Sequence, residues 1–292
     1  MRKGDDLMRP RDWKSSGNEP WVYRAKDMDD LLGVHADLME SRLRNGEQVR
    51  YLLYSPMFEE EVTPFGARGE RASHAVAVAN DRFLISRDTH RRRAPTRVEV
   101  IPFDAVLCVE LGAALFMGWL VIRYSLGSSV AGSVVIHKST GSEIFAEAIR
   151  EYRLATIEAG PCVSNLPETS CAGHWEKMPP DVAARIGSLM LADEEPLALA
   201  RASPVWAQTR RLWRTTFVNA VSETFLALTT GALFITSRER GIRPEMWDYG
   251  VNVVCINIKA VGSARLVRKT AHGSFPTGRL PNSAESARAI SC

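Results

Sequence analysis

The sequence predicts a mainly β fold with flanking helices (α+β), and two observations support this prediction. The first is a β-rich unit that occurs twice, near residues 28–155 and, less completely, near residues 180–270. The second is the alternation of strand-forming runs with polar turns inside each copy, followed in the first copy by one amphipathic helix. A repeat of this length indicates that each copy is one structural unit.

Three sequence blocks occur in the same order in both copies. GEQVRYLLYSPMF (46–58) resembles EEPLALARASPVW (194–206) at an offset of 148 (195 − 47), with Glu47 matching Glu195. AVAVANDRFLISR (75–87) resembles FLALTTGALFITS (225–237) at 150 (225 − 75), and VIPFDAV (100–106) resembles CINIKAV (255–261) at 155 (255 − 100). Offsets that rise by a few residues indicate small insertions in loops.

The elements of the first copy follow from local signals. A helix is predicted over Asp27–Leu43, and the Asn80-Asp81 pair inside 75–87 is typical of a hairpin turn. Two more strands follow, over 115–125 and 133–139. Thr140 and Glu143 form a capping box for a helix whose apolar stripe runs from Ile144 to Tyr152. The first copy therefore has about seven strands and a closing helix.

The second copy is predicted to be incomplete. A helix over Asp181–Leu191 precedes it, and Thr230-Gly231 replaces the hairpin turn. Beyond Val261 the chain has 31 residues left (292 − 261), interrupted by glycine and proline, with no apolar stripe. Three explanations stay open: a truncated or frame-shifted end, completion by the first copy, or completion by another chain.

These blocks resemble the bacterial pleckstrin-homology-like domain, a relative of PH and GRAM modules. The resemblance rests on the helix before Gly46-Glu47, on 82–86 and 101–106, and on 232–238 and 256–261 in copy 2. It implies two PH-like partial barrels, the first capped by its C-terminal helix, and no catalytic residues. The expected organisation is a flexible extension (1–26), domain 1 (27–157), a linker (158–179), domain 2 (180–270) and an irregular tail (271–292).

Composition narrows the class of protein. A net charge of +3 over 292 residues is too small to indicate nucleic-acid binding. The longest apolar run, Leu111–Ile122, is shorter than the ~20 residues that span a bilayer, and no signal peptide is visible, so a cytoplasmic location is predicted. Cys162, Cys171 and His174 fit no C-x₂-C pair and lack a fourth ligand, so neither metal nor cofactor is expected.

A cluster of cations follows the first hairpin and is the principal candidate ligand site: Arg87, His90, Arg91, Arg92, Arg93 and Arg97. Such a cluster could hold a phosphate, an anionic lipid headgroup or an acidic partner. The alternative is a solvated basic loop. Lipid-binding PH domains carry their cations in the first inter-strand loop, where this chain has Glu59, Glu60 and Glu61, which argues against phosphoinositides.

The equivalent first loop of copy 2 is a candidate interaction loop, with Arg210, Arg211, Trp213 and Arg214. Interleaved arginine and tryptophan could stack on bases or anchor an interface. The alternative is a basic loop over one buried tryptophan. The opposite charges of the two first loops suggest attraction, within one chain or between two.

The sequence contains no nucleotide-binding, zinc-protease or hydrolase motif, and its histidines are isolated. The predicted function is therefore a non-catalytic tandem PH-like module that scaffolds through contacts with a protein partner or itself. The alternative is a peripheral binder of anionic ligands or a membrane surface through residues 87–97. An unrecognised hydrolase is a further alternative, and it would need a pocket with converging titratable groups.

Overall fold

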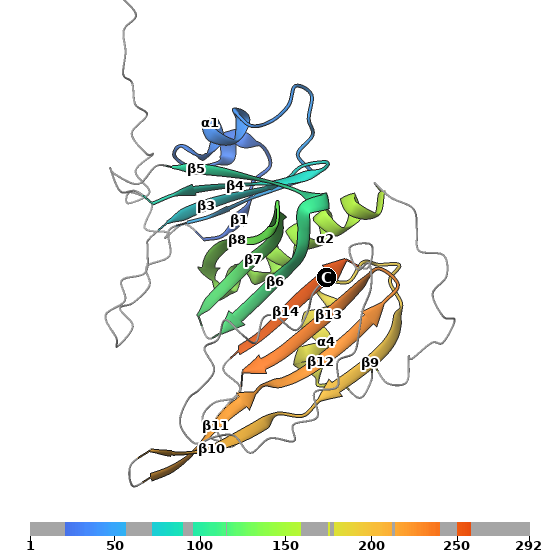
Figure 1. The fold of residues 1–292 in the computed structure, drawn as a ribbon. Helices are drawn as coiled ribbons and strands as arrows, with labels where there is room; N and C mark the ends of the chain where they lie inside the picture. Colours follow the sequence, from blue (N-terminus) through green and yellow to red (C-terminus); the bar gives the residue numbers. More distant parts are fainter. Residues whose placement is uncertain are drawn as a thin grey trace, which may run out of the picture.

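The computed structural model of the chain describes residues 21–56, 72–89, 96–114, 116–158, 175, 178–211, 214–239 and 250–257 (Figure 1). The predicted tail lies outside these residues, as do most of the predicted N-terminal extension and linker. Within the described ranges, no helix is long and apolar enough to cross a membrane.

The fold is mainly β with few helices, as predicted, and its described strands form three antiparallel sheets. The five-stranded sheet has the order β1-β2-β3-β4-β5: β1 Tyr23–Arg24, β2 Tyr51–Ser55, β3 Ser73–Val78, β4 Arg82–Asp88 and β5 Arg97–Pro102. The seven-stranded sheet has the order β8-β7-β6-β14-β13-β12-β9: β6 Val106–Ala114, β7 Met117–Leu126, β8 Ser129–Lys138, β9 Pro196–Ala202, β12 Glu223–Thr229, β13 Ala232–Glu239 and β14 Gly250–Asn257. Both sheets are open, so the described strands close no barrel.

The helices are short apart from one. They are η2 Met28–Asp30, α1 His35–Glu40, η3 Phe103–Ala105, η4 Ser139–Gly141, α2 Ser142–Glu158 and α4 Pro180–Gly187. The closing helix of copy 1 is confirmed as α2, whose Phe145, Ile149 and Tyr152 are buried. The continuous helix predicted over Asp27–Leu43 is wrong, because Gly33 adopts a left-handed φ of 69° between η2 and α1.

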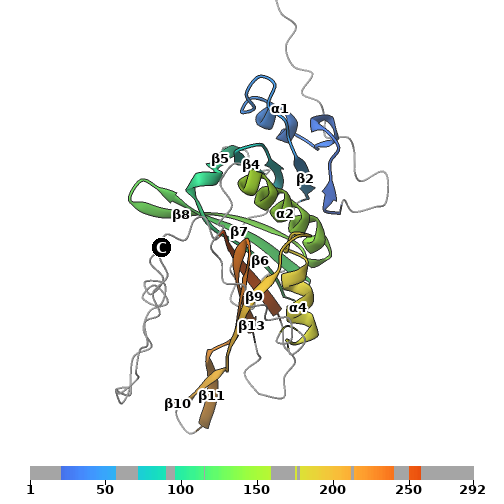
Figure 2. The ribbon, with the colours of Figure 1, turned by 90° about the vertical axis from the view of Figure 1, so that its right-hand side faces the viewer.

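The first loop of copy 2 is also different from its prediction. It forms a third, two-stranded sheet, β10 Val205–Arg211 paired with β11 Arg214–Val221. This ribbon extends away from the seven-stranded sheet (Figures 1 and 2). Strand-forming residues on both sides of the turn, rather than the charges at its tip, explain the ladder.

The strand ladders reproduce the second and third sequence blocks in register. Ala77 pairs with Leu84, and Ala227 pairs with Phe234, so β3–β4 and β12–β13 are related by the predicted offset of 150 (227 − 77). On the next strand Leu84 pairs with Val100 and Phe234 with Cys255, which gives the predicted 155 (255 − 100). Strands β2, β3, β4 and β5 thus correspond to β9, β12, β13 and β14.

The first block is shifted by one residue from the prediction. Tyr51 pairs with Val78, and Ala198 pairs with Leu228, so β2 and β9 are related by 147 (198 − 51) and the offset of 148 is wrong. A turn before each strand fixes this register.

In copy 1, the Glu47 carboxylate accepts a hydrogen bond from the Arg44 backbone N–H at 2.8 Å. In copy 2, Glu194 accepts one from the Leu191 N–H at 2.9 Å. Glu194, and not Glu195, is therefore the counterpart of Glu47.

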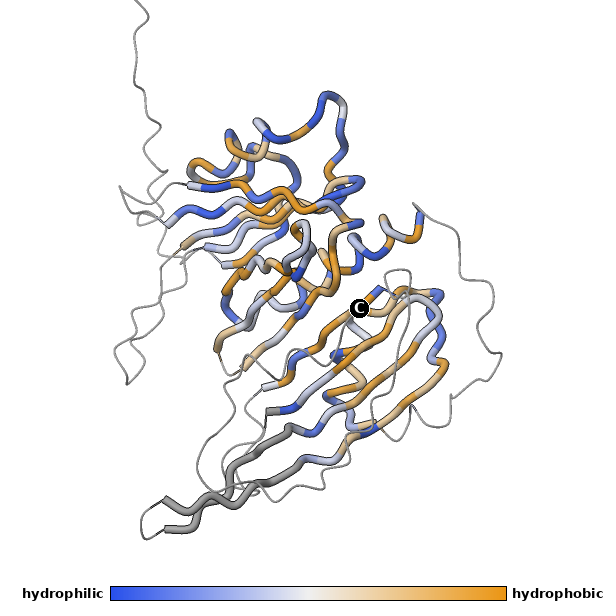
Figure 3. Tube along the Cα trace, viewed as in Figure 1, coloured by the Kyte–Doolittle hydropathy of each residue, from blue (hydrophilic) through white to orange (hydrophobic). Residues whose placement is uncertain are grey.

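One hydrophobic core spans both copies. Helix α2 lies between the two large sheets and contacts β2, β3, β6 and β7 (Figures 1 and 2). The core around it also contains Phe225, Phe234 and Val253 of copy 2 and Val182 and Ile186 of α4. Hydrophobic residues recur along the strands that meet there (Figure 3). A smaller core lies under α1 on the other face of the five-stranded sheet.

The two copies also share a sheet. Strand β14 pairs with β6 along Gly250–Cys255, so the first copy covers the strand edge at which copy 2 was expected to be unfinished. Three explanations for the incomplete copy were open. Among the described strands, copy 2 pairs with the first copy, which corresponds to the second of these explanations. The residues after Asn257 lie outside the described ranges.

Candidate functional site

A hollow of about 540 Å³ surrounds the edge strand β5. Its lining comes from the end of α1 and the following turn on one face of the sheet, and from β8 on the other. Three arginines line it, Arg42, Arg87 and Arg97, together with one glutamate, Glu99. With histidine neutral, these groups give the lining a net charge of +2 (3 − 1).

A polar row crosses four strands at this place. Ser55 on β2 pairs with His74 on β3, His74 pairs with Arg87 on β4, and Arg87 pairs with Arg97 on β5. Directly paired residues share a face of the sheet, so these four side chains lie side by side. Arg87 and Arg97 lie directly opposite each other on β4 and β5, so two cationic side chains are neighbours on this face.

The inner half of this row is buried without hydrogen bonds. His74 is 5% exposed and Ser55 is fully buried, yet neither imidazole nitrogen of His74 nor the Ser55 hydroxyl has a partner in the described part of the chain. Buried polar groups are nearly always hydrogen-bonded, and an orphaned group commonly marks a place for a water, ion or ligand. His74 lines the hollow, so it offers such a group to a bound molecule.

The electrostatics of His74 suit binding. Burial, reinforced by the charges of Arg87 and His35, lowers the pKa of His74 from 6.5 to about 3. The imidazole is therefore neutral at pH 7, with one N–H donor and one acceptor nitrogen.

On β5, the Glu99 carboxylate accepts a hydrogen bond from the Tyr124 hydroxyl, which raises the pKa of Tyr124 to about 12. Glu99 is the only carboxylate among the described lining residues, and this hydrogen bond occupies one of its lone pairs.

Copy 2 has no such cationic row at the same register. The counterparts of Ser55, His74, Arg87 and Arg97 are Ala202, Thr224, Ser237 and Asn252. The Ser237 hydroxyl donates to the Asn252 side-chain oxygen, so those groups satisfy each other. Arg238, the cation that follows Ser237, pairs with Asp181 at 3.1 Å and Glu223 at 3.5 Å.

The structure brings together part of the predicted cation cluster. Arg87 and Arg97 face each other and line the hollow, while His90, Arg91, Arg92 and Arg93 lie outside the described residues. In the second predicted set, Arg211 pairs with Arg214 at the tip of the β10–β11 ribbon, next to Arg210. Trp213 lies outside the described residues, as do Glu59–Glu61, Cys162, Cys171 and His174.

Sequence reasoning missed Ser55, His74 and Arg42. The signal for His74 was present: a two-residue turn at Asn80-Asp81 pairs residues whose numbers sum to 161, and 74 + 87 is 161. Arg42 and Ser55 reach the site through tertiary packing and cross-sheet register, for which no local pattern exists.

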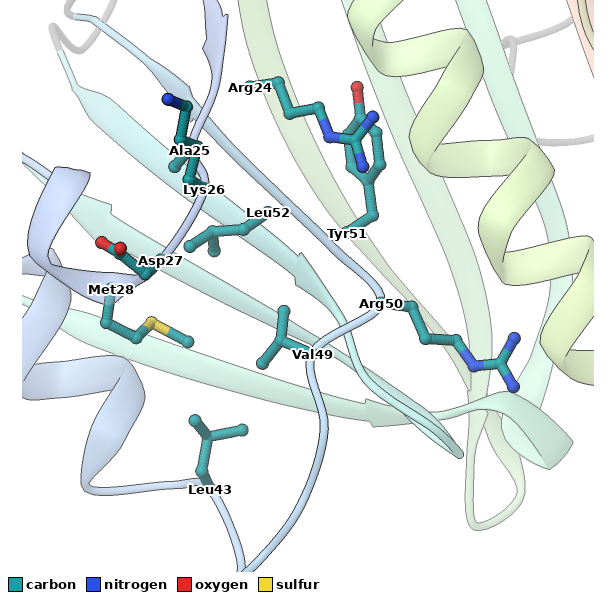
Figure 4. Close-up of a pocket in the computed structure, with 10 residues that line it drawn as sticks. All are labelled: Arg24, Ala25, Lys26, Asp27, Met28, Leu43, Val49, Arg50, Tyr51 and Leu52. Atoms are coloured by element: carbon teal, nitrogen blue, oxygen red, sulfur yellow. The ribbon is translucent and has the colours of Figure 1, made fainter.

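A second hollow, of about 660 Å³, lies at the opposite edge of the five-stranded sheet (Figure 4). Met28, Leu43, Val49 and Leu52 form its apolar part. Its arginines are already engaged: the Arg24 guanidinium lies 4.7 Å over the Tyr51 ring, and Arg50 pairs with Glu158. This hollow is larger, but its arginines point toward α2 and away from the apolar side chains (Figure 4).

A buried histidine–serine group lies under α1. His35 Nδ1 is 2.6 Å from Ser86 Oγ, and Nε2 is 3.0 Å from Ser73 Oγ. All three residues are at most 1% exposed, so no substrate reaches them. The group fixes α1 to β3 and β4 and does not form an accessible nucleophile.

Comparisons of the chain with models of protein families, with characterised proteins and with solved structures found no match.

Proposed function

We propose that the chain is a non-catalytic binding module, built from two PH-like repeats, that contacts a partner protein by holding one of its acidic groups in the hollow around β5. The observation that carries this proposal is His74, buried and without a hydrogen bond, beside Arg87 and Arg97. A carboxylate or phosphate oxygen can accept from the imidazole N–H and from guanidinium groups at once.

The order of elements supports the PH-like part of the proposal. Strands β2 to β8 are seven in number within copy 1 and are followed directly by α2, the order that the sequence resemblance implies. Helices α1 and α4 precede equivalent strands in the two copies, and each packs on the equivalent face of its sheet. A helix, then strands, then a covering helix is a scaffold that positions loops and edges for binding.

A binding role fits the titratable groups of the hollow better than catalysis. A general base works best with a pKa near the operating pH, and that of His74 is about 3. Glu99 accepts a hydrogen bond from Tyr124, and the other charged lining groups are arginines, whose planar guanidinium suits binding of carboxylate or phosphate.

The test compares the row of copy 1 with that of copy 2. The double variant Arg87→Ser, Arg97→Asn places at β4 and β5 the residues that copy 2 has there. Titration with inorganic pyrophosphate, followed by NMR of the His74 ring, is expected to show affinity at least about tenfold weaker than in the unaltered chain.

The matched control is Lys26→Gln, which removes one positive charge at the other edge of the same sheet. It is expected to bind pyrophosphate as the unaltered chain does. Equal affinity in the double variant, or binding that leaves the His74 signals unchanged, would contradict the proposal.

A membrane surface is the second candidate, and one observation favours it. Leu126 and Val130, at the tip of the β7–β8 hairpin, are 63% and 64% exposed, and β8 lines the hollow with Gly132–Val134. Aliphatic side chains beside cations are suited to an anionic bilayer interface. Sedimentation with phosphatidylserine vesicles at low salt tests it, and Leu126→Ser with Val130→Ser is expected to abolish the binding.

A further inference from the structure

Strand β5 is an open edge with space on both of its faces. It is the last strand of the five-stranded sheet, and no described strand pairs with its outer side. The hollow surrounds this side, lined by the α1 end on one face and by β8 on the other. An exposed edge of this kind presents unpaired backbone N–H and C=O groups to a partner.

The phase of the hydrogen bonds identifies which backbone groups point outward. The Ala79 N–H donates to the Arg82 carbonyl at 3.0 Å, which closes the β3–β4 hairpin. In an antiparallel ladder the bonding direction alternates, so odd-numbered residues of β4 bond to β5. The Phe103 N–H donating to the Asp81 carbonyl at 2.8 Å agrees with this phase.

The residues of β5 that bond to β4 are therefore Arg97, Glu99 and Ile101, the direct partners of odd-numbered β4 residues. Val98 and Val100 direct their N–H and C=O groups outward. Pro102 is the next outward residue, and it has no N–H to offer. The open stretch of the edge is thus short and ends at Pro102. Proline is tolerated there because its nitrogen points outward and no hydrogen bond to β4 is lost.

The same chain already adds a strand at the equivalent edge of copy 2. Strand β14 is the counterpart of β5, and its outer side pairs with β6 along Gly250–Cys255. The counterparts of Val98 and Val100 are Val253 and Cys255, at the offset of 155. The PH-like sheet of this protein therefore accepts an extra antiparallel strand on this edge once, and on the corresponding edge of copy 1 no described strand is paired.

We propose that β5 binds an extended segment of a partner protein as an added β-strand, with acidic side chains facing Arg97 and apolar side chains facing Val98 and Val100. This inference rests on the proposed function, because it names the ligand class of the same hollow. Strand addition draws affinity from backbone hydrogen bonds and specificity from alternate side chains. Arg97 and Glu99 lie on one face of β5, and Val98 and Val100, the latter 37% exposed, lie on the other.

An alternating acidic and apolar sequence is the expected recognition pattern. On the His74 side, every second residue of the added strand meets Arg87, Arg97 and Glu99, which give this face a net charge of +1 (2 − 1). On the α1 side, the intervening residues meet Leu38 and Val98, with Ser41 and Arg42 at the rim. A segment whose acidic residues are contiguous cannot place them all on one face, because successive side chains of a strand point to opposite faces.

The test uses a fluorescein-labelled peptide of alternating aspartate and valine, titrated into the full chain and followed by anisotropy. Three matched peptides accompany it: the same composition with its aspartates contiguous, the alternating peptide N-methylated at every second residue, and the alternating peptide with asparagine for aspartate. Binding at least about tenfold weaker is expected for each of the three.

The matching protein variants act on the strand edge. Val100→Pro removes an outward N–H without a ladder bond to β4, and is expected to weaken peptide binding while leaving pyrophosphate affinity unchanged. Val100→Ile keeps both the N–H and the apolar side chain and is the control. Circular dichroism verifies folding, and if Val100→Pro does not fold, the N-methylated peptide carries the same test.

The outcomes separate the two proposals. Pyrophosphate binding with equal affinity for the alternating and N-methylated peptides overturns strand addition and leaves the anion site standing. Binding to phosphatidylserine vesicles without binding to any peptide overturns strand addition in favour of the membrane. If the unaltered chain binds neither pyrophosphate nor any of the peptides, the proposed function itself is overturned.

Discussion

At the residue scale, the property that distinguishes this protein is a histidine in an unusual state. His74 is buried, has no described hydrogen-bond partner and lies beside Arg87 on the adjacent strand. A protein does not gain stability from such a residue, because a buried unsatisfied group costs about 1–3 kcal/mol. The cost is consistent with a residue retained for a ligand, which would restore the missing hydrogen bonds.

The lowered pKa of His74 predicts how stability depends on pH. A base whose pKa falls from 6.5 to about 3 on folding binds protons more readily in the unfolded chain. Above pH 6.5 the group is neutral in both states, and stability does not depend on its titration. Below pH 6.5 the unfolded chain binds the proton first, so the free energy of unfolding falls as the pH drops toward the folded value. Between pH 7 and about pH 4.5 we expect a loss of about 3 kcal/mol from this group, measured by urea unfolding.

His74→Thr, which introduces the residue of copy 2, is expected to remove most of that pH dependence. His137, whose pKa burial lowers to about 4, adds a loss of the same sign and remains in the variant. An unchanged slope of unfolding free energy against pH in His74→Thr would show that the imidazole is not buried and neutral.

At the element scale, one ion pair connects helix α2 to the start of β9. The Arg153 guanidinium pairs with the Glu194 carboxylate, and the two side chains are 2% and 3% exposed. Arg153 also donates to the Leu189 carbonyl, and Thr229 donates to Glu194 at 3.2 Å. Gly231 is needed in the adjacent turn, because a Cβ there would lie 2.2 Å from the Glu194 carboxylate.

Glu194→Gln is predicted to destabilise the protein by about 3–5 kcal/mol, because it leaves the Arg153 charge buried without a counter-ion. The control is Arg44→Gln in the exposed pair Arg44–Asp81, whose side chains are 62% and 54% exposed. That change is expected to leave the free energy of unfolding nearly unchanged, because solvent screens an exposed pair. Urea unfolding measures both, and similar values for the two variants would contradict the buried geometry.

The elements also show what sequence patterns can and cannot predict. The hairpin 75–87 and helix α2 were predicted because a polar turn and a 3.6-residue apolar stripe are local signals. The long helix before Gly46 was not found, since Gly33 ends it and its position in the left-handed region depends on how α1 packs. The one-residue shift between β2 and β9 follows from the turns at Glu47 and Glu194. Sequence similarity alone aligned Glu47 with the neighbouring glutamate and so did not show this shift.

At the scale of the whole molecule, the two copies share a core and a sheet. Helix α2 of copy 1 packs in the same cluster as Phe225 and Phe234 of copy 2, and β14 pairs with β6. Neither copy can lose its packing without exposing apolar surface of the other. Unfolding of the two copies is therefore expected to be coupled.

Phe234→Ala tests this coupling. The ring is fully buried, with the Arg153 guanidinium 5.1 Å from its centre, so the change is expected to cost about 3–5 kcal/mol. Hydrogen exchange is expected to accelerate in β3 and β4 of copy 1 as well as in β12 and β13. Faster exchange confined to copy 2, or two separate transitions in calorimetry, would show that the copies unfold independently.

The sequence by itself determined the β-rich repeat, its 150 and 155 offsets, the closing helix and two of the arginines at the hollow. These follow from local periodicity and turn chemistry, which a chain carries in every short segment. Only the tertiary structure decided the pairing of β14 with β6, the open edge of β5, and the meeting of Ser55, His74 and Arg42 with those arginines. Such contacts join residues far apart in the chain, and their free energy depends on burial and register that no local pattern specifies.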